Sequence, residues 1–324
     1  MTRTSADRIL GCFKGIATGD AIGKQTETLS QADIARWYPH GVRGFEGAPG
    51  EVIPRYAGNS KHEWRIGETT DDTERTIAVA RAIVRTRSVS HASIGHEMLG
   101  CRKCVHPGIS SLWEFHQAGD AARIATMHDG CGGAVRVAPV GIFHAAHDLD
   151  AVVVGAREAS ISTHGGSLAI AAAAATAAAV SGAVDGASAQ QILSLAEWAA
   201  ELAESRWPGT GASAFADAVR TAHDDLAAMP RIRASDVAAR WFPDRPLTIV
   251  PLALALATVM HSADEAILIA ANVGGDSDSV ASIAGGILGA RDPGTLNQQW
   301  YTVVDRVNDH ELEILADQLA PLRR

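Results

Sequence analysis

The chain has 324 residues, of which 47% are hydrophobic and 20% are charged, and its formal net charge is −9. A negative chain without a basic run is unsuited to polyanions, so we expect no nucleic-acid partner. The longest apolar stretch, Leu168–Val180, is too short to span a bilayer, which argues against a membrane partner. Residues 1–16 contain no continuous apolar segment, so we expect no secretory signal and a cytoplasmic location.

Two global features predict the fold class. No Pro/Ser-rich linker or charge run divides the sequence, so residues 1–324 are predicted to form a single domain. The alanine-rich, low-aromatic composition, with few alternating β-branched runs, predicts helices and no sheet. We therefore expect an all-α protein with many helices in one compact unit.

The first predicted element is a helix on which Ile9, Phe13 and Ile16 share one face. It is followed by the small residues of Gly15–Gly23, predicted as glycine-punctuated chain packed beside a site, with Glu27 nearby. The long irregular stretch Tyr38–Glu68 is rich in glycine and charge, and we expect it to be a loop that covers a cleft. Within it, Trp64 is expected to close the core, and stacking on an adenine is the alternative.

A second helix is predicted after Thr70, because Ile77, Ala80 and Val84 follow at helical spacing. Pro243, Pro246 and Pro251 are expected to punctuate a loop before a further helix. The other helices predicted from apolar patterning are Leu168–Val180, Gln190–Glu204, Ala214–Met229, Leu252–His261 and Glu311–Leu319.

Two helix starts carry unusually many oxygen donors. Thr70-Asp71-Asp72 begins one helical pattern, and Asp276-Ser277-Asp278-Ser279 begins another, after Gly274-Gly275. Either start alone is compatible with helix capping and with the helix dipole. One cap residue suffices, however, and each segment supplies two carboxylates and a hydroxyl. If the two segments meet, four carboxylates require cations, and hard oxygen ligands favour two Mg²⁺ or Mn²⁺ ions.

Two other motif interpretations of Asp276–Ser279 fail. An EF-hand loop starting at Asp276 needs glycine at its sixth position and glutamate at its twelfth, where Ala281 and Ile287 stand. The Asp-x-Asp-x-Val pattern also resembles the nucleophile motif of aspartate-type phosphohydrolases. Those enzymes need a downstream lysine, and this chain has none after Lys103.

In content and order, these segments resemble the ADP-ribosylglycohydrolase family. The matching segments run from about Ile9 to Gly289, nearly the whole chain. They are Gly19-Asp20-Ala21-Ile22-Gly23 with Glu27, Thr70-Asp71-Asp72-Thr73 and Gly274-Gly275-Asp276-Ser277-Asp278-Ser279. Two weaker matches lie between them, Gly130-Cys131-Gly132-Gly133-Ala134-Val135-Arg136-Val137-Ala138-Pro139 and Ser162-Thr163-His164.

The resemblance implies a fold, a cofactor and a set of site residues. It implies an all-helical domain with a cleft that holds two divalent cations, Mg or Mn, and a catalytic role for Glu27 at the scissile ribose. The metal ligands that it implies are Thr70, Asp71, Asp72, Asp276, Asp278 and Ser279. The substrate-binding residues that it implies are Gly130, Cys131, Gly132, Gly133, His164, Gly274 and Gly275.

The chain departs from the family pattern more at pocket positions than at metal positions. Cys131 stands where asparagine is usual, Val135 where methionine is usual, and Thr28 where phenylalanine is usual. Lys24-Gln25 replaces a small residue and proline, whereas Ser279 keeps the hydroxyl of the more usual threonine. We therefore expect this chain to share the family's metal-dependent chemistry more closely than it shares the family's substrates.

Three functions remain open on the sequence. The first is a metal-dependent hydrolase that cleaves the C1″ ribosyl bond of ADP-ribosylated protein side chains or of small ADP-ribosyl conjugates. The second is a hydrolase of a smaller N- or O-riboside, such as a nucleoside. The third is a non-catalytic binding or structural protein of the same fold, which the intact carboxylates disfavour.

Two single residues keep alternative interpretations. Arg136 is a candidate for a phosphate contact, or it pairs with an acid. His164 is either a structural histidine or a ligand contact.

Overall fold

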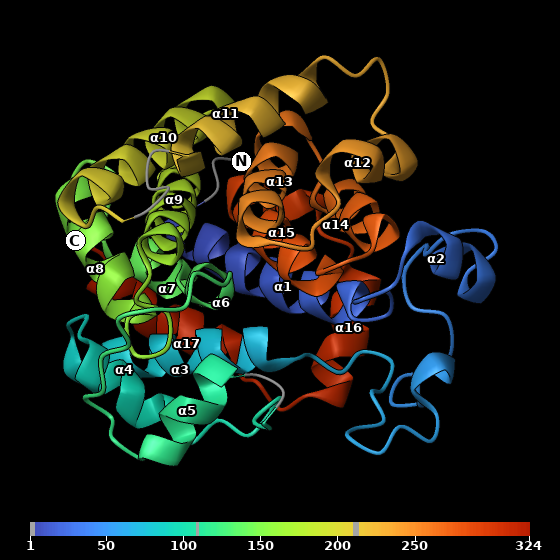
Figure 1. Ribbon diagram of the computed structural model, residues 1–324, viewed down its shortest axis with the longest axis horizontal. Coiled ribbons are helices and arrows are strands. Elements are labelled where there is room, and N and C mark those ends of the chain that lie inside the picture. Colours follow the sequence, from blue (N-terminus) through green and yellow to red (C-terminus); the bar gives the residue numbers. More distant parts are fainter. Residues whose placement is uncertain (1–3, 108–109, 210–213) are drawn as a thin grey trace.

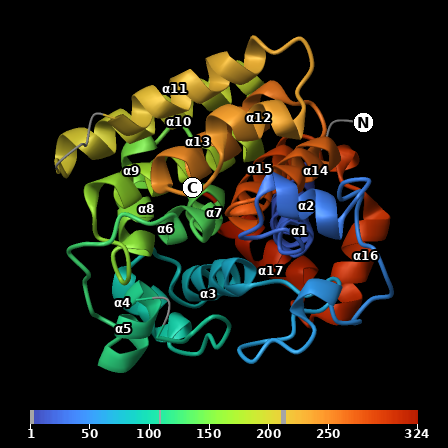
Figure 2. The same ribbon diagram turned by 45° about the vertical axis from the view of Figure 1, so that its right-hand side comes forward.

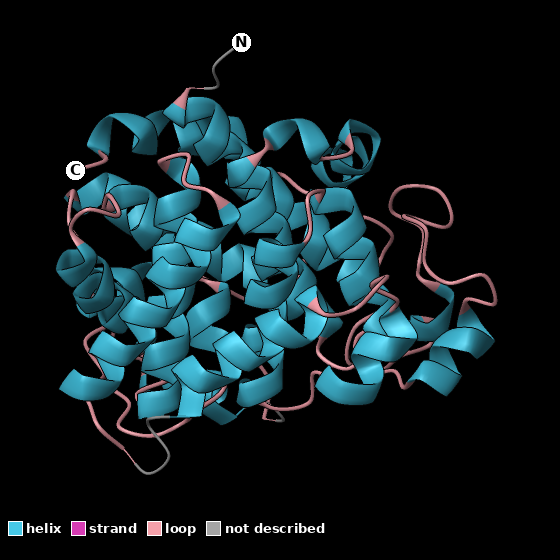
Figure 3. Ribbon diagram, turned by 90° about the horizontal axis from the view of Figure 1, so that it is seen from above, coloured by secondary structure: helices cyan, strands magenta, loops and turns pink. Residues whose placement is uncertain are grey.

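The structure, a computed structural model, describes residues 4–107, 110–209 and 214–324. These residues form seventeen α-helices and three short 3₁₀ turns, and they form no sheet, since their one β-bridge, between Val52 and Arg65, is isolated. The helices pack around one large hydrophobic core. The loops that connect them lie mostly at the surface (Figures 1 and 3). The all-α prediction is confirmed.

The α-helices are α1 (Ser5–Gly23), α2 (Gln31–Trp37), α3 (Asp71–Thr86), α4 (His91–Met98), α5 (Ser110–Ala118), α6 (Gly132–Val135), α7 (Ala138–Phe143), α8 (Leu149–Ser160), α9 (Ser167–Val184), α10 (Ala189–Arg206), α11 (Ala214–Ala227), α12 (Ala234–Trp241), α13 (Pro246–Val259), α14 (Ala263–Val273), α15 (Ser277–Arg291), α16 (Gln298–Val307) and α17 (Leu312–Leu319). The 3₁₀ turns are η1 (Pro54–Tyr56), η2 (Pro293–Thr295) and η3 (Ala320–Leu322).

Helices α1 and α15 cross in direct backbone contact near the middle of the molecule (Figure 2). A Cβ built on Gly15 would overlap the carbonyl oxygen of Gly285, and one built on Gly19 would overlap that of Ala281. Gly23, at the end of α1, lies against Asp278, near the start of α15. The two helices are therefore antiparallel, and their contact brings the end of α1 to the beginning of α15.

Helix α9 is the central apolar helix. By length and composition Ser167–Val184 could cross a membrane, but 89% of it is buried inside the protein. Its alanines let α7, α8 and α10 pack closely against it. The prediction of a buried helix at Leu168–Val180 is confirmed.

Several predicted boundaries differ from the structure. Helix α1 continues through the glycines to Gly23, because the small residues allow the close crossing with α15 and do not end the helix. Helix α13 begins at Pro246 and includes Pro251, so the predicted loop is wrong there. Proline fits the first helical turn because that N–H has no intrahelical partner, and the apolar remainder of α13 is buried, which favours the helix beyond Pro251.

Helix α9 extends four residues beyond its predicted end, to Val184, whereas the other predicted helix ends differ by one or two residues, and several helices were missed. Helix α11 ends at Ala227, and α17 begins at Leu312 because Glu311 has left-handed backbone angles. The predictions did not include α2, α4 to α8, α12, α14 or α16. The stretch Tyr38–Glu68 is irregular apart from η1, as expected.

Candidate metal centre

Three segments far apart in the sequence meet at one place: the end of α1, the start of α3 and the start of α15. The Ser279 hydroxyl donates to Asp72 Oδ2 at 3.0 Å, across 207 residues of sequence. Asp20, in α1, accepts hydrogen bonds from the backbone N–H groups of Thr70 at 2.9 Å and Thr73 at 3.2 Å. The two aspartate-bearing helix starts, whose meeting the sequence left as a condition, therefore do meet in the structure.

Of the two residues at the N-cap positions of α3 and α15, only Thr70 caps its helix. Thr70 is the N-cap of α3, and its hydroxyl accepts from the Asp72 N–H at 3.1 Å. Asp276 is at the N-cap position of α15, yet its side chain makes no capping hydrogen bond. Its Oδ2 accepts from the Cys131 thiol at 3.2 Å. The carboxylate of Asp276 therefore does not cap the helix. It contributes to a carboxylate cluster, which we define as Asp20, Glu27, Asp71, Asp72, Asp276 and Asp278.

The cluster is electrostatically unfavourable without added cations. Burial raises the pKa of Asp72 well above its ordinary value, and Asp20 and Asp276 raise it further. Burial also raises the pKa of Asp278 well above its ordinary value, and Glu27 adds to the effect. Such mutual effects arise when several carboxylates share a poorly solvated region.

Two basic side chains contact the carboxylate cluster. Lys24 is buried, forms an ion pair with Glu27 and lies 3.7 Å from Asp278 Oδ2. Burial alone would lower the pKa of Lys24, but Asp278 and Glu27 raise it above its ordinary value. Arg75 is also buried and pairs with Asp71 one turn earlier on α3.

The donor set fits divalent cations in chemistry and in charge. The carboxylates are Asp20, Glu27, Asp71, Asp72, Asp276 and Asp278. When all six are ionised, Lys24 and Arg75 offset two of the six negative charges, which leaves four. Two divalent cations would balance that remainder, and hard oxygen donors suit Mg²⁺ or Mn²⁺. Asp20 Oδ1 is buried and has no hydrogen-bond partner among the described residues.

The side chains do not yet form a coordination shell. In the described part of the chain, no three Cys, His, Asp or Glu side chains are arranged so that they could hold a metal ion as they stand. Two of the predicted ligands contact basic side chains instead, Asp71 with Arg75 and Asp278 with Lys24. Rotation of these side chains would be needed for them to bind a cation.

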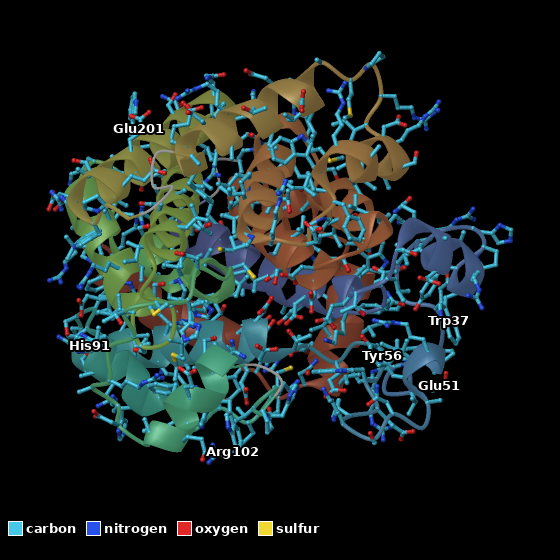
Figure 4. The ribbon with its side chains drawn as sticks, in the orientation of Figure 1. Trp37, Glu51, Tyr56, His91, Arg102 and Glu201 are labelled. Carbon is cyan, nitrogen blue, oxygen red and sulfur yellow. The ribbon has the colours of Figure 1, made fainter. Side chains whose placement is uncertain are left out.

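Glu27 lies between the aspartates of the carboxylate cluster and a cavity of about 780 Å³. Its side chain is 27% exposed, pairs with Lys24 and accepts from the Tyr56 hydroxyl at 3.4 Å. The cavity is lined by Lys24, Glu27, Thr28, Tyr56, Asn59, Lys61, His62, Trp64, Glu68, Arg102, Lys103, Cys104, Val105 and His106. Tyr56, in the loop after α2, and Arg102, in the segment after α4, are labelled in Figure 4.

The loop predicted to cover a cleft does line this cavity, through residues 56 to 68. Trp64 is 8% exposed and packs with Ile53, Tyr56 and Ile66 in a small second hydrophobic cluster. The predicted core position of Trp64 is therefore confirmed, and the same residue also forms part of the cavity wall.

The glycine-rich segment packs between His164 and the carboxylates. A Cβ on Gly132 would come within 2.5 Å of the His164 ring, and one on Gly130 within 3.1 Å. Gly133 packs against Ser160, and Cys131 reaches Asp276. The segment is thus held against the cluster, at positions that do not line the 780 Å³ cavity.

His164 is a buried, neutral histidine. Its Nδ1 lies 2.7 Å from Thr163 Oγ1 and its Nε2 lies 3.4 Å from Ser111 Oγ. Burial lowers its pKa well below the ordinary value, and Arg136 lowers it further. These contacts establish a structural role, and the predicted contact with substrate stays a prediction.

Gly274 and Gly275 form the turn before α15. Their φ angles are +84° and +63°, which favour glycine. A Cβ on Gly274 would overlap the carbonyl oxygen of Leu29, and one on Gly275 would come within 2.5 Å of that of Pro243. The structure thus shows how these glycines place Asp276, while their predicted contact with substrate stays a prediction.

Arg136 neither pairs with an acid nor reaches the cavity. It is fully buried, and its guanidinium donates to the carbonyl oxygens of Gly132, Ala159 and Ser160 at 2.9 to 3.0 Å. Among the described residues its hydrogen-bond partners include no acid, so the predicted acid pair is wrong, and the predicted phosphate contact stays a prediction.

Asp20, Lys24 and Tyr56 belong to the site but were not predicted as site residues. Asp20 and Lys24 had a signal in the sequence, because both stand in or directly after the run of small residues Gly15–Gly23. Such a run allows close helix packing, which buries the charged side chains beside it. Tyr56 had no such signal, because its place depends on how the loop after α2 folds back over α1.

Comparisons with known proteins agree with this geometry. A model of the ADP-ribosylglycohydrolase family matches residues 1–324, so the chain belongs to that family. Family and fold together support a hydrolase of the ADP-ribosylglycohydrolase type. A solved structure described as an ADP-ribosylglycohydrolase-related protein complex shares the fold, with a TM-score of 0.69, 22% identity and full coverage of both chains.

Three sequence relatives are similar to the chain. An uncharacterized protein of Archaeoglobus fulgidus is 27% identical over 98% of this chain and 97% of its own length. The uncharacterized protein YegU of Escherichia coli is 26% identical over 98% of both chains. ADP-ribosyl-(dinitrogen reductase) glycohydrolase of Rhodospirillum rubrum is 26% identical over 44% of this chain and 47% of its own length.

Proposed function

We propose that this protein is a divalent-cation-dependent hydrolase that cleaves the C1″ ribosyl bond of an ADP-ribosyl conjugate. The observation that carries the proposal is the convergence of Asp72, Asp276, Asp278 and Ser279 beside Glu27, at the edge of a cavity. Family membership agrees with this assignment. The acceptor, whether a protein side chain or a small molecule, is left open.

The proposed ligands are Thr70, Asp71, Asp72, Asp276, Asp278 and Ser279, with two cations, Mg or Mn. Bound cations would neutralise the carboxylates and act as Lewis acids toward the oxygens of the substrate. The chain itself contributes the scaffold: the α1–α15 crossing fixes Asp20 and Asp278, and the Ser279–Asp72 hydrogen bond ties α15 to α3.

Glu27 is the proposed catalytic base. In hydrolysis, water adds to C1″ while the bond to the acceptor atom breaks, and positive charge grows on the ribose ring in the transition state. The acceptor atom leaves with the bonding electron pair and takes up a proton. The proton that water loses must be accepted, and the carboxylate of Glu27 faces the cavity where that water would enter. Contacts with Lys24 and Tyr56 orient the carboxylate. Such general-base assistance typically contributes about 10²–10⁴-fold to the rate.

The charge of the cavity favours an anionic conjugate over a neutral nucleoside. Four basic side chains line it, namely Lys24, Lys61, Arg102 and Lys103, against the two acids Glu27 and Glu68. The excess of positive charge is local, since the whole chain has a net charge of −9. A diphosphate group would be attracted to such a lining, and the volume is in the range of small-molecule sites.

The test is turnover of a substrate panel by metal-stripped protein with added Mg²⁺ or Mn²⁺. The panel contains ADP-ribosyl-arginine and ADP-ribosyl-serine peptides, O-acetyl-ADP-ribose and simple nucleosides, with products separated by chromatography. We expect metal-dependent release of ADP-ribose, and we expect Asp278→Asn to reduce it at least a hundredfold. Asp317→Asn, on the exposed face of α17, is the matched control and should keep wild-type activity.

Each outcome of the panel is informative. Release of products from nucleosides alone would replace the proposal with a nucleoside-type hydrolase. Full activity of Asp278→Asn, or full activity in EDTA, would contradict the proposed metal centre. No turnover of any conjugate by metal-loaded protein would contradict the ADP-ribosyl hydrolase assignment.

A further inference from the structure

Lys24 places a positive charge where a metal ion is expected. Its side chain is only 5% exposed, and its ammonium pairs with Glu27 and lies 3.7 Å from Asp278 Oδ2. Its backbone N–H donates to the Asp20 carbonyl at 2.9 Å, so the last turn of α1 fixes its position. One ammonium therefore stands between the proposed catalytic base and a proposed metal ligand.

Through its ammonium, Lys24 already contacts two groups besides Asp278, namely Glu27 and the ring of Trp64. Its ammonium lies 4.4 Å from the centre of the Trp64 ring, and its side chain lines the 780 Å³ cavity. An ammonium that left Asp278 could remain with Glu27 and the face of Trp64, which attracts cations. A short movement toward the cavity would suffice, and no helix would have to move.

A divalent cation and the ammonium cannot both occupy the space beside Asp278 Oδ2. Two positive charges a few ångströms apart repel strongly in a poorly solvated site. The carboxylate must exchange one for the other, and the free energy of its contact with the ammonium is lost when a metal binds.

We propose that Lys24 competes with a divalent cation for Asp278, and so determines how tightly the centre binds metal. When the cation binds, the ammonium moves from Asp278 toward Trp64 and the cavity and keeps its contact with Glu27. Metal binding is thereby coupled to the position of the residue that orients the proposed base. This inference rests on the metal dependence proposed above.

The first test is calorimetric titration of the full-length, metal-stripped protein with Mn²⁺. Lys24→Met removes the competing charge and should lower the apparent Kd at least tenfold. Lys24→Arg keeps the charge and should stay within about threefold of wild type. Lys61→Met removes another positive charge that lines the cavity, and it should bind Mn²⁺ as wild type does.

The outcomes separate this inference from the proposed function. Equal or weaker Mn²⁺ binding by Lys24→Met would overturn the competition while leaving metal dependence intact. An equal gain in Lys61→Met would also overturn it, because general electrostatics would then explain the effect. Absence of Mn²⁺ binding in every variant would overturn both this inference and the metal dependence.

A second test uses the unmodified protein, so it does not depend on the folding of a variant. A brief pulse of an acetylating reagent, with and without Mn²⁺, is followed by mass spectrometry of the peptide that contains Lys24. Mn²⁺ should increase acetylation of Lys24 at least threefold, because the ammonium moves toward the cavity. Acetylation of Lys14, which pairs with the distant Glu313, should not change. Unchanged or reduced labelling of Lys24 would contradict the proposed movement.

Discussion

At the scale of single residues, His310 forms a hydrogen bond with the segment that precedes α3. Its Nε2 lies 2.7 Å from the hydroxyl of Thr69, the residue before Thr70. Burial, together with the positive charges of Lys103 and Arg81, lowers its pKa to about 4. In the unfolded chain a histidine titrates near pH 6.5. The unfolded state therefore binds a proton at a higher pH than the folded state does.

The sign of the pH dependence follows from this difference. The contribution of neutral His310 to stability is complete above pH 6.5 and is lost as the pH falls toward 4. Each pH unit in that window costs up to about 1.4 kcal/mol of the free energy of unfolding. We expect His310→Gln to flatten the fall measured by urea unfolding between pH 7 and 5. His147→Gln, at an exposed position, should keep the wild-type slope, and an unchanged slope in His310→Gln would contradict the prediction.

At the scale of secondary structure, the α1–α15 crossing determines where the cluster forms. A Cβ on Gly19 would overlap the backbone of Ala281, which no side-chain rotation can relieve. The residues that follow each contact, Asp20 on α1 and Ser282 on α15, are themselves fully buried. Overpacking at such a position costs about 1–3 kcal/mol, occasionally more.

We therefore expect Gly19→Ala to lower the free energy of unfolding by at least about 2 kcal/mol. The variant should also weaken Mn²⁺ binding, because Asp20 on α1 holds the start of α3, so separating α1 from α15 would separate Asp72 from Asp278. Gly182→Ala on α9 is the control, since the atom that its Cβ would meet first is the tip of the flexible Leu195 side chain. Chemical unfolding and calorimetry would measure both effects. A Gly19→Ala protein as stable as the control would show that the crossing tolerates a methyl group.

At the scale of the whole molecule, the proposed cations would connect segments from both ends of the chain. Asp72 and Asp278 are more than two hundred residues apart, so metal binding requires the complete fold. A ligand that binds only the folded state stabilises it by about 2.7 kcal/mol at one hundred times its Kd. We expect Mn²⁺ to raise the thermal unfolding midpoint in a concentration-dependent manner, at constant ionic strength.

Variants separate specific binding from general screening. Asp276→Asn should lose most of the Mn²⁺-dependent increase, whereas Asp317→Asn, remote from the cluster, should keep it. An equal increase in both variants would assign the stabilisation to screening of the net negative charge.

The fold was largely predictable because its signals are local. Apolar spacing located α3, α9, α10 and α15, and the composition predicted the absence of a sheet. The predicted helix boundaries were wrong where tertiary packing determines them. The glycines of α1 are compatible with either a helix or a loop until Gly285 and Ala281 are placed against them. Pro251 lies inside α13 because the surrounding apolar residues are buried.

The candidate site was predictable in part. The sequence by itself determined which oxygen donors are available, since Thr70, Asp71, Asp72, Asp276, Asp278 and Ser279 stand at two recognisable helix starts. It also determined the helical character and the family resemblance. Only the tertiary structure decided that these starts meet across the α1–α15 crossing, and that Asp20 and Lys24 join them. The physical reason is that spacing along the chain governs helices, whereas close packing and the solvation of charge depend on neighbours distant in sequence.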